Sequence, residues 1–321
     1  WYDRIQASGL IEVAASQAEI NANDPTQPDE TMGDVDLSTI ELVVDARIIA
    51  HVDGHVMLKY EADEVFVDEG FITLTGPNDL PVYLIAGRQY IPFGNFDSHF
   101  VTDPATLVLG ETNEGAVVAG YRFAGERLDL SVGAFNGRIG KAGDDDAIDS
   151  FVAAAVLRPM DSLLLGVSYS SNLGASDNLS EAVTDTSGDG SSGPIQDLVG
   201  GWAAFVSYEF FDRFKFIGEY AAALDDFEAG ALYDENETQK RQPSAWNIEL
   251  GALLIDGLQL AIRYGGSEDG GSAFLPETEY AVVLDWGFVA NTNLSLEYLH
   301  AEFEDDAQEI DAVTAQLAVT F

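Results

Sequence analysis

The chain has 321 residues, with 14 Lys and Arg against 56 Asp and Glu, which gives a formal net charge of −42 at pH 7. A surface this negative repels phosphate, so nucleic acid is excluded as a partner. Apolar residues make up 46% of the chain, more than a disordered acidic chain contains. There is no cysteine, which excludes disulfide scaffolds, thiol catalysis and cysteine-bound metals.

Hydropathy alternates along the chain with a period of two residues. The longest purely apolar run covers residues 151–157, far fewer than the about 20 residues that a transmembrane helix needs. In 39–48, by contrast, every second residue is apolar: Ile40, Leu42, Val44, Ala46 and Ile48. Such alternation is typical of a β-strand with one apolar face.

Followed along the chain, this pattern predicts about sixteen strands. In order they cover 3–16, 37–49, 53–61, 66–75, 81–90, 114–124, 126–137, 148–158, 161–171, 197–210, 212–224, 244–254, 256–265, 276–286, 290–301 and 309–321. A tilted strand crosses a bilayer with about 9–11 residues, and the predicted strands are long enough to do so.

The connections between these strands alternate in length. Short and long connections follow each other in turn, except near 62–65, where a short connection stands in place of a long one. The long connections cover 17–36, 91–113, 138–147, 172–196, 225–243, 266–275 and 302–308. The long loops would then leave one end of the sheet, as in outer-membrane barrels with short periplasmic turns. We therefore predict a single domain over 1–321, an all-β transmembrane antiparallel barrel of about sixteen strands in the bacterial outer membrane, with long acidic extracellular loops.

Most basic residues fall on the predicted inner faces of the strands. An Arg or Lys that faces lipid near the midplane costs about 2–4 kcal/mol, which favours the lumen for these residues. The predicted lumenal charges are Arg4, Arg47, Lys59, Arg88, Arg122, Arg127, Arg213, Lys215 and Arg263, together with Glu12, Glu41, Asp45, Glu69, Asp129, Glu219, Glu249, Asp285 and Glu297. A barrel of this strand number has an aqueous bore, so the charges indicate a channel.

The long connection 91–113 differs from the others because it is less acidic and richer in aromatic and aliphatic residues. We predict that it folds into the barrel and narrows the pore. Its acids Asp97, Asp103 and Glu111 would face wall residues such as Arg88 and Arg122, so that opposed charges filter solutes. Other pore-lining residues would be Arg47, Lys59 and Arg127. The alternative is a lid or a loop that contacts another subunit.

An enzyme is not expected. The histidines His51, His55, His99 and His300 are scattered without the spacing of a metal or catalytic motif. We interpret them as polar wall or interface residues, and we expect no cofactor.

One motif suggests a metal. Residues 185–190 read DTSGDG, and Asp185, Ser187 and Asp189 have the spacing that opens a calcium-binding loop. The twelfth position holds Gln196 instead of the bidentate carboxylate that such loops use. The alternative is a plain polar loop rich in Ser, Gly and Asp.

The N-terminal part resembles the LbtU-type siderophore porins. The resemblance rests on RIQASGLIEVAAS (4–16), VDEGFITL (67–74), LIAGRQYIPFGNF (84–96), TDPATLVLGETNEGAVVAGY (102–121) and GAFNG (133–137). It implies an outer-membrane barrel without a TonB-dependent plug that admits ferric siderophore or other small solutes. The resemblance carries over no siderophore-binding residue.

The sequence therefore predicts a porin, a passive pore for small hydrophilic solutes that favours cations. A channel specific for ferric siderophores is the second possibility, and a structural or adhesive surface barrel that binds divalent cations is the third. The expected surroundings are outer-membrane lipid and lipopolysaccharide, and a homotrimer is expected by analogy with this class of barrel.

Overall fold

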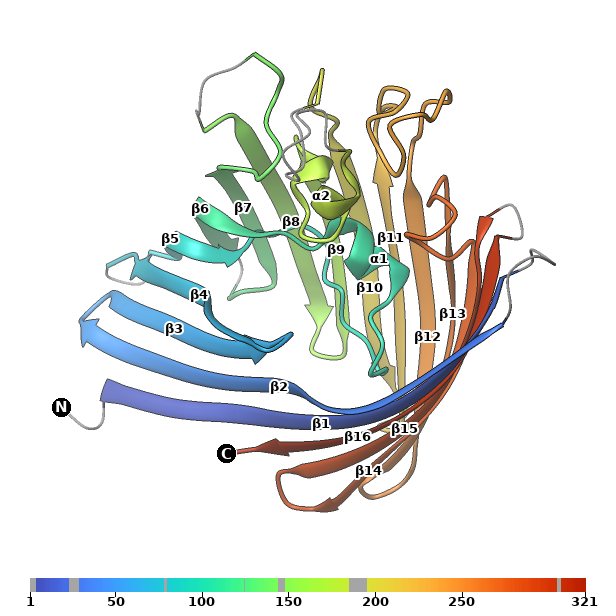
Figure 1. Ribbon diagram of the computed structural model, residues 1–321. Helices are drawn as coiled ribbons and strands as arrows, with labels where there is room; N and C mark the ends of the chain where they lie inside the picture. Colours follow the sequence, from blue (N-terminus) through green and yellow to red (C-terminus); the bar gives the residue numbers. More distant parts are fainter. Residues whose placement is uncertain are drawn as a thin grey trace.

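The computed structural model describes residues 4–22, 29–77, 80–123, 125–143, 148–184, 195–304 and 307–321. Within these residues sixteen strands form one closed antiparallel barrel, in which sequence neighbours pair and β1 pairs with β16 (Figure 1). The strands are β1 (Ile5–Ala22), β2 (Glu30–Ile49), β3 (Val52–Glu61), β4 (Glu64–Thr75), β5 (Val82–Tyr90), β6 (Asn113–Phe123), β7 (Leu128–Phe135), β8 (Ser150–Met160), β9 (Leu163–Ser170), β10 (Gly201–Phe210), β11 (Phe214–Ala223), β12 (Ser244–Ile255), β13 (Leu258–Glu268), β14 (Thr278–Val289), β15 (Thr292–Glu302) and β16 (Gln308–Thr320). The predicted fold class and strand number are confirmed.

The connections separate by length between the two ends of the barrel. Short turns such as 50–51, 161–162 and 256–257 lie at the end where β1 begins and β16 ends, which is the periplasmic end in barrels of this class. The opposite end carries the long loops (Figure 1), among them 91–112 with α1 (Ala105–Gly110) and 171–200 with η2 (Leu173–Ala175) and α2 (Leu179–Ala182). No helix in the described ranges is both long and apolar enough to span a membrane.

The predicted loop 17–36 is wrong in extent. β1 continues to Ala22 and β2 already begins at Glu30, and the two strands stay paired up to Ile20 opposite Glu30. Apolar alternation fades there because a strand pair that extends beyond the bilayer contacts water on both faces, while its backbone pairing continues. The described acidic residues of this segment therefore lie on strands, and β1 pairs there with β2 on one side and with β16 on the other.

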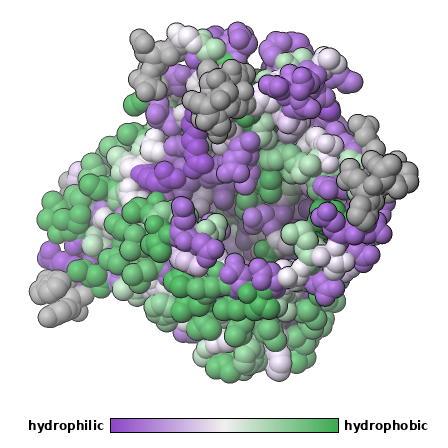
Figure 2. Space-filling view, viewed as in Figure 1, coloured by the Kyte–Doolittle hydropathy of each residue, from purple (hydrophilic) through white to green (hydrophobic). Residues whose placement is uncertain are grey.

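The outward-facing positions of the strands are largely apolar. Exposed apolar side chains recur at every second residue, for example Leu260, Ile262 and Tyr264 on β13 or Val282, Leu284 and Trp286 on β14. Figure 2 shows hydrophobic surface over the lower part of the barrel and hydrophilic surface around the upper loops. A closed barrel pairs its backbone polar groups internally, so such a surface suits a lipid environment.

The barrel closes where the last residue returns to β1. The N–H of Gly9 donates to the carbonyl of Phe321 over 2.9 Å, and the N–H of Phe321 donates to the carbonyl of Gly9 over 3.0 Å. The ring of Phe321 lies on Gly9, because a Cβ added to this glycine would stand 2.5 Å from Cζ of the ring. Glycine at position 9 therefore makes room for the terminal aromatic residue.

An apolar core lies inside the barrel and is built largely by the long loops. Its wall side is formed by fully buried small residues, Ala203, Ala221 and Ala245, which let the loops approach β10–β12 closely. Its loop side includes Ile91, Phe93, Leu109, Ile139, Leu173, Leu179, Phe227, Leu232 and Leu275. The core fills the lumen beside these strands, whereas the inner faces of β1–β4 and β14–β16 line open cavities.

The closure predicts that Gly9→Val destabilises the barrel. The new side chain would displace the Phe321 ring, and overpacking of this kind costs about 1–3 kcal/mol. The measurement is the temperature at which the folded, fast-migrating band converts to the unfolded band on unheated electrophoresis. Gly115→Val is the matched control, because a Cβ added there meets no atom within 4 Å. Equal conversion temperatures for both variants would contradict this account of the closure.

Candidate functional site

Residues 91–112, which we call the inner loop, cross the lumen instead of extending into the medium. The inner loop leaves β5, and its α1 helix contacts β11, β12 and β13 (Figure 1). Where the crossing begins, the N–H of Gly94 donates to Ser168 Oγ on β9 over 2.9 Å. Gly94 has a φ of +71°, and a Cβ there would collide with the ring of Phe96. This position therefore requires glycine.

Wall carboxylates hold the backbone of the inner loop. Glu219 on β11 accepts hydrogen bonds from the N–H groups of Asn95 and Phe96 over 2.7 and 2.9 Å. Glu249 on β12 accepts from the N–H of His99 and the hydroxyl of Ser98, both over 2.8 Å.

The same arrangement continues on β14 and β15. Glu297 accepts from the N–H groups of Val101 and Thr102 over 2.6 and 3.3 Å, and also from the Thr102 hydroxyl. Glu279 accepts a hydrogen bond from the N–H of Ala105, the first residue of α1. The N-cap residue of this helix makes no side-chain hydrogen bond to it. Hydrogen bonds to ionised acceptors are worth about 1.5–3 kcal/mol each, so the set fixes the loop firmly.

Arg263 on β13 compensates part of this buried negative charge. Its side chain is fully buried, with Nε 3.1 Å from Glu249 Oε1 and Nη2 2.7 Å from both Ser98 Oγ and the carbonyl oxygen of Thr102. The guanidinium also lies 4.3 Å from the centroid of the Phe100 ring. Because every one of these contacts is internal, Arg263 is sequestered from solutes in the pore.

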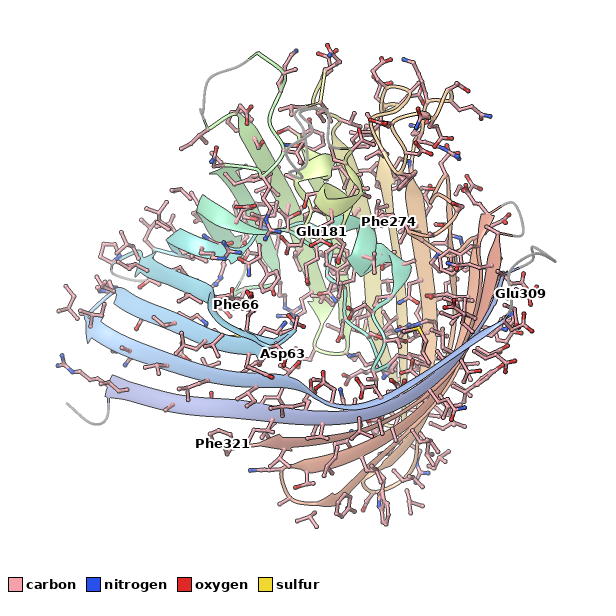
Figure 3. All side chains as sticks on the ribbon, viewed as in Figure 1. Asp63, Phe66, Glu181, Phe274, Glu309 and Phe321 are labelled. Atoms are coloured by element: carbon pink, nitrogen blue, oxygen red, sulfur yellow. The ribbon has the colours of Figure 1, made fainter. Side chains whose placement is uncertain are left out.

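Acidic side chains that are not used as anchors gather around the remaining opening. Asp103 and Glu111 of the inner loop interact electrostatically with Lys59 on β3, and so do Glu12 on β1 and Glu41 on β2. We call these five residues the lumenal acidic cluster. Lys59 is itself paired with Glu61, with Nζ 3.1 Å from Oε2. The extracellular ends of β3 and β4 in this wall, marked by Asp63 and Phe66 in Figure 3, lie lower in the view than those of β9–β13.

Glu111 is the titratable member of this cluster near neutral pH. Burial, together with the neighbouring carboxylates of Asp103 and Asp177, raises the pKa of Glu111 to about 7. The charge of the cluster therefore changes around neutrality.

Beneath the inner loop lies a cavity of about 520 Å³. Its carboxylates are Glu12 and Asp285, and its other polar wall residues include Gln259, Asn293 and Gln316. The tip of the inner loop, from Ser98 to Val101, forms its roof. No Lys or Arg is among the described residues that line it.

The acidic residues of the inner loop lie near basic residues, but not near Arg88 and Arg122 as predicted. Asp97 pairs with Lys215 at 2.5 Å. Asp103 interacts electrostatically with Arg263 and, less strongly, with Lys59, and Glu111 interacts with Lys59. The predicted pairing of loop acids with Arg88 and Arg122 is wrong.

Arg88 stands on the outer face of β5, opposite to the inward-facing Tyr83 and Gln89. It donates over 3.2 Å to the carbonyl of Asp68, the extra residue of a β-bulge in β4. Strict alternation from Tyr83, whose hydroxyl donates to the lumenal Asp129, determines this orientation. The prediction that Arg88 points into the lumen is therefore wrong.

Three further basic residues that were predicted to line the pore, Arg47, Arg122 and Arg127, lie near the periplasmic turns and away from the inner loop. Arg122 is 3.3 Å from Asp129 and stacks 4.7 Å over the Tyr83 ring. Arg47 is 3.7 Å from Asp53, and Arg127 donates over 3.2 Å to the carbonyl of Pro159. Local alternation does not predict how far along the barrel axis each residue lies, so it could not separate these residues from Lys59.

The anchoring role of Glu219, Glu249 and Glu297 was missed, although alternation placed all three on inner faces. Glu279 was not selected at all, yet it shares the period-two face of Asp285 on β14. A local pattern shows that a carboxylate points inward, but it does not show that a distant loop lies on it.

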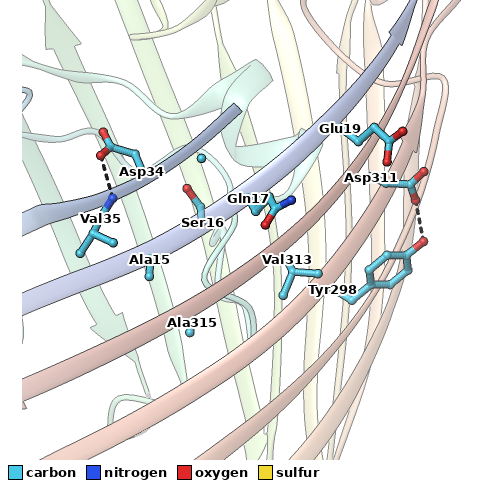
Figure 4. A pocket seen from close by; sticks show the side chains of 11 residues that line it. Ala15, Ser16, Gln17, Glu19, Asp34, Val35, Tyr298, Asp311, Val313 and Ala315 are labelled. Carbon is cyan, nitrogen blue, oxygen red and sulfur yellow. Dashed lines mark hydrogen bonds between the residues drawn. The ribbon is translucent and has the colours of Figure 1, made fainter. Parts of the chain in front are cut away.

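A larger depression of about 930 Å³ lies on the outer wall of β15, β16, β1 and β2 (Figure 4). Its floor is formed by the small residues Ala15, Ala315 and Gly33, and the Tyr298 hydroxyl donates over 2.6 Å to Asp311 at its upper end. Because these side chains face away from the lumen, the depression is separate from the pore.

The suggested calcium residues Asp185, Ser187 and Asp189 lie outside the described residues. Elsewhere, in the ranges that the structure describes, no group of three His, Asp or Glu side chains is arranged to hold a metal.

Sequence comparison finds relatives of the UPF0422 group, while no protein-family model matches the chain. The UPF0422 protein of Coxiella burnetii (strain RSA 493 / Nine Mile phase I) is 26% identical over 264 residues, which covers 78% of this chain and 55% of that protein. The UPF0422 protein of Legionella pneumophila strain Lens is 23% identical over 326 residues, which covers 92% and 58%. The chain thus spans little more than half the length of these relatives.

Solved structures with the same architecture are outer-membrane porins and channels. The channel DcaP of Acinetobacter baumannii superposes with a TM-score of 0.69 at 14% identity, covering 99% of this chain and 97% of DcaP. The anion-selective porin of Comamonas acidovorans gives 0.65 at 10% identity, with 99% of both chains covered. OmpF of Salmonella typhi gives 0.63 at 12% identity, covering 100% and 99%. The chain therefore has the fold of these porins.

The anchoring of the inner loop predicts that Glu219→Gln loosens it. Glutamine keeps the shape but accepts through a neutral oxygen and brings an amide donor toward two N–H groups. A loss of about 1.4 kcal/mol corresponds to about tenfold faster amide exchange. Hydrogen–deuterium exchange of the peptide that covers Asn95 and Phe96 measures the effect. Asp285→Asn is the control, since Asp285 faces the lumen without contacting the inner loop. Unchanged exchange in Glu219→Gln would show that the carboxylate is not an anchor.

Proposed function

We propose that the chain forms a passive, water-filled diffusion pore for small hydrophilic solutes and that this pore favours cations. The observation that carries the proposal is the lumenal acidic cluster, in which Glu12, Glu41, Asp103 and Glu111 surround Lys59. Lys59 is already paired with Glu61, so the local balance is negative.

The cavity beneath the inner loop supports the same preference. Glu12 and Asp285 contribute its negative charge, and Arg263 and Lys215 are bound in ion pairs with Glu249 and Asp97. The fold itself does not determine selectivity, because one porin of this fold is described as anion-selective. Selectivity follows from the charges that line the route.

Planar-bilayer recording in a KCl gradient tests the proposal. We expect a reversal potential of the sign set by K⁺, with a K⁺/Cl⁻ permeability ratio well above one at about pH 8. The ratio should fall at about pH 6, because Glu111, with a pKa raised to about 7, is then largely protonated. Absence of conductance, or a reversal potential set by Cl⁻, would overturn the proposal.

Two variants test whether Glu111 causes this pH dependence. Glu111→Gln should give the low ratio at both pH values. Asp226→Asn, which removes an exposed acid in the loop after β11, should keep the wild-type response.

Uptake of ferric siderophore is the alternative that is supported by the resemblance of segments 4–16, 67–74, 84–96, 102–121 and 133–137 to the LbtU-type siderophore porins. In the same recordings, current block by micromolar ferric siderophore would favour that function over general diffusion. A homotrimeric assembly is supported by the solved trimer form of OmpT of Vibrio cholerae, which shares the fold with a TM-score of 0.59.

A further inference from the structure

A second group of lumenal residues lies below the acidic cluster, toward the periplasmic end of the β1–β4 wall. One cross-strand row runs from Gln6 through Asp45 and His55 to Phe71. The same row continues to Ala116 and Phe135, which are buried inside the barrel, so it faces the lumen.

The adjacent row toward the periplasm adds two arginines. Arg47, Asp53 and Thr73 stand opposite one another on β2, β3 and β4, and Arg4 precedes β1 beside them. The two rows enclose a cavity of about 620 Å³, which we call the exit pocket.

The floor of the exit pocket contains two aromatic rings. The rings of His55 and Phe71 stack with centroids 4.6 Å apart and an interplanar angle of 14°. His55 is fixed from one edge by Asp45, with Nδ1 2.7 Å from the carboxylate, and Nε2 is 3.6 Å from Glu69. These contacts fix the ring pair in the wall of the pocket, where an apolar or aromatic group of a solute can contact it.

The charges around this floor have both signs and remain accessible. The side chain of Arg47 is 74% exposed and that of its partner Asp53 45%, and that of Asp45 is 52% exposed. Arg4 donates over 3.4 Å to the carbonyl of Ile48, which leaves the rest of its exposed guanidinium available. Two guanidinium groups and two carboxylates thus surround one aromatic surface within a single cavity.

We propose that the exit pocket binds small zwitterions that carry an apolar or aromatic side chain, such as free amino acids. The carboxylate of the solute would pair with Arg4 and Arg47, its ammonium with Asp45 and Asp53, and its side chain would lie on Phe71. A purely anionic analogue would pair only with the guanidinium groups and would be repelled by the carboxylates. A purely cationic analogue would pair only with the carboxylates and would be repelled by the guanidinium groups. This inference rests on the proposed pore, because solutes reach the pocket through the lumen.

Calorimetric titration of the purified barrel in detergent tests the inference without requiring conductance. The probes are L-phenylalanine, its cationic amide and the anion 3-phenylpropionate, which share one ring. We expect phenylalanine to bind about fivefold or more tightly than either analogue, which corresponds to about 1 kcal/mol. Equal affinities for the three probes, or no binding of phenylalanine, would overturn the inference.

Variants locate the site. Arg47→Gln and Phe71→Leu should each weaken phenylalanine binding by about fivefold or more. Arg122→Gln changes another lumenal arginine near the periplasmic end, outside the exit pocket, and should leave binding unchanged. An equal effect of Arg47→Gln and Arg122→Gln would place the zwitterion elsewhere. Binding without conductance would refute the proposed pore and keep the pocket, whereas conductance without binding would refute the pocket alone.

Discussion

The lumen of this barrel is organised by hydrogen bonds between wall carboxylates and the backbone of the inner loop. Between Asn95 and Thr102 the chain has no strand partner, and unpaired N–H groups inside a protein are costly. Glu219, Glu249 and Glu297 stand on different strands and each accept from consecutive loop residues. The wall thus supplies the acceptors that a β-ladder would otherwise provide. Once the loop is anchored on this wall, the open part of the lumen lies on the side of β1–β4 and β14–β16.

This arrangement gives the acidic residues of the chain different roles. Some are buried as acceptors, and Arg263 balances part of that charge. Others are used in bridges among the extracellular loops, where Arg241 contacts Glu237, Asp269 and Glu304 at 2.7 to 3.5 Å. The remainder faces the water of the lumen and sets the electrostatic potential that a solute meets. The net charge of −42 is therefore a poor measure of the field in the pore.

The barrel was predictable from local patterns because each strand repeats the same rule, an apolar residue outward at every second position. The pattern failed at two kinds of site. In β1 and β2 it ended before the strands did, since the bilayer ends before the backbone pairing. At Arg88 the assignment of faces was wrong, because Arg88 follows Gly87, whose cross-strand row with Phe71 and Ala116 faces the lumen. Predicting the carboxylate anchors would have required knowing which distant segment covers them. Predicting the role of Lys59 would have required knowing how far along the barrel axis each strand extends. Both depend on the shear of the barrel and on the path of the loop, which a short stretch of sequence does not determine.

The path of the inner loop can be tested most directly by cross-linking, because these 321 residues contain no cysteine. His99 on the inner loop touches Gln259 on β13, with Gln259 Nε2 2.7 Å from His99 Nδ1. A short thiol cross-linker should therefore join the double variant His99→Cys/Gln259→Cys rapidly in intact outer membranes. The pair His99→Cys/Thr73→Cys, with its second site on the opposite β4 wall, should stay unjoined under the same conditions. Efficient linkage of the second pair with failure of the first would contradict the anchored loop.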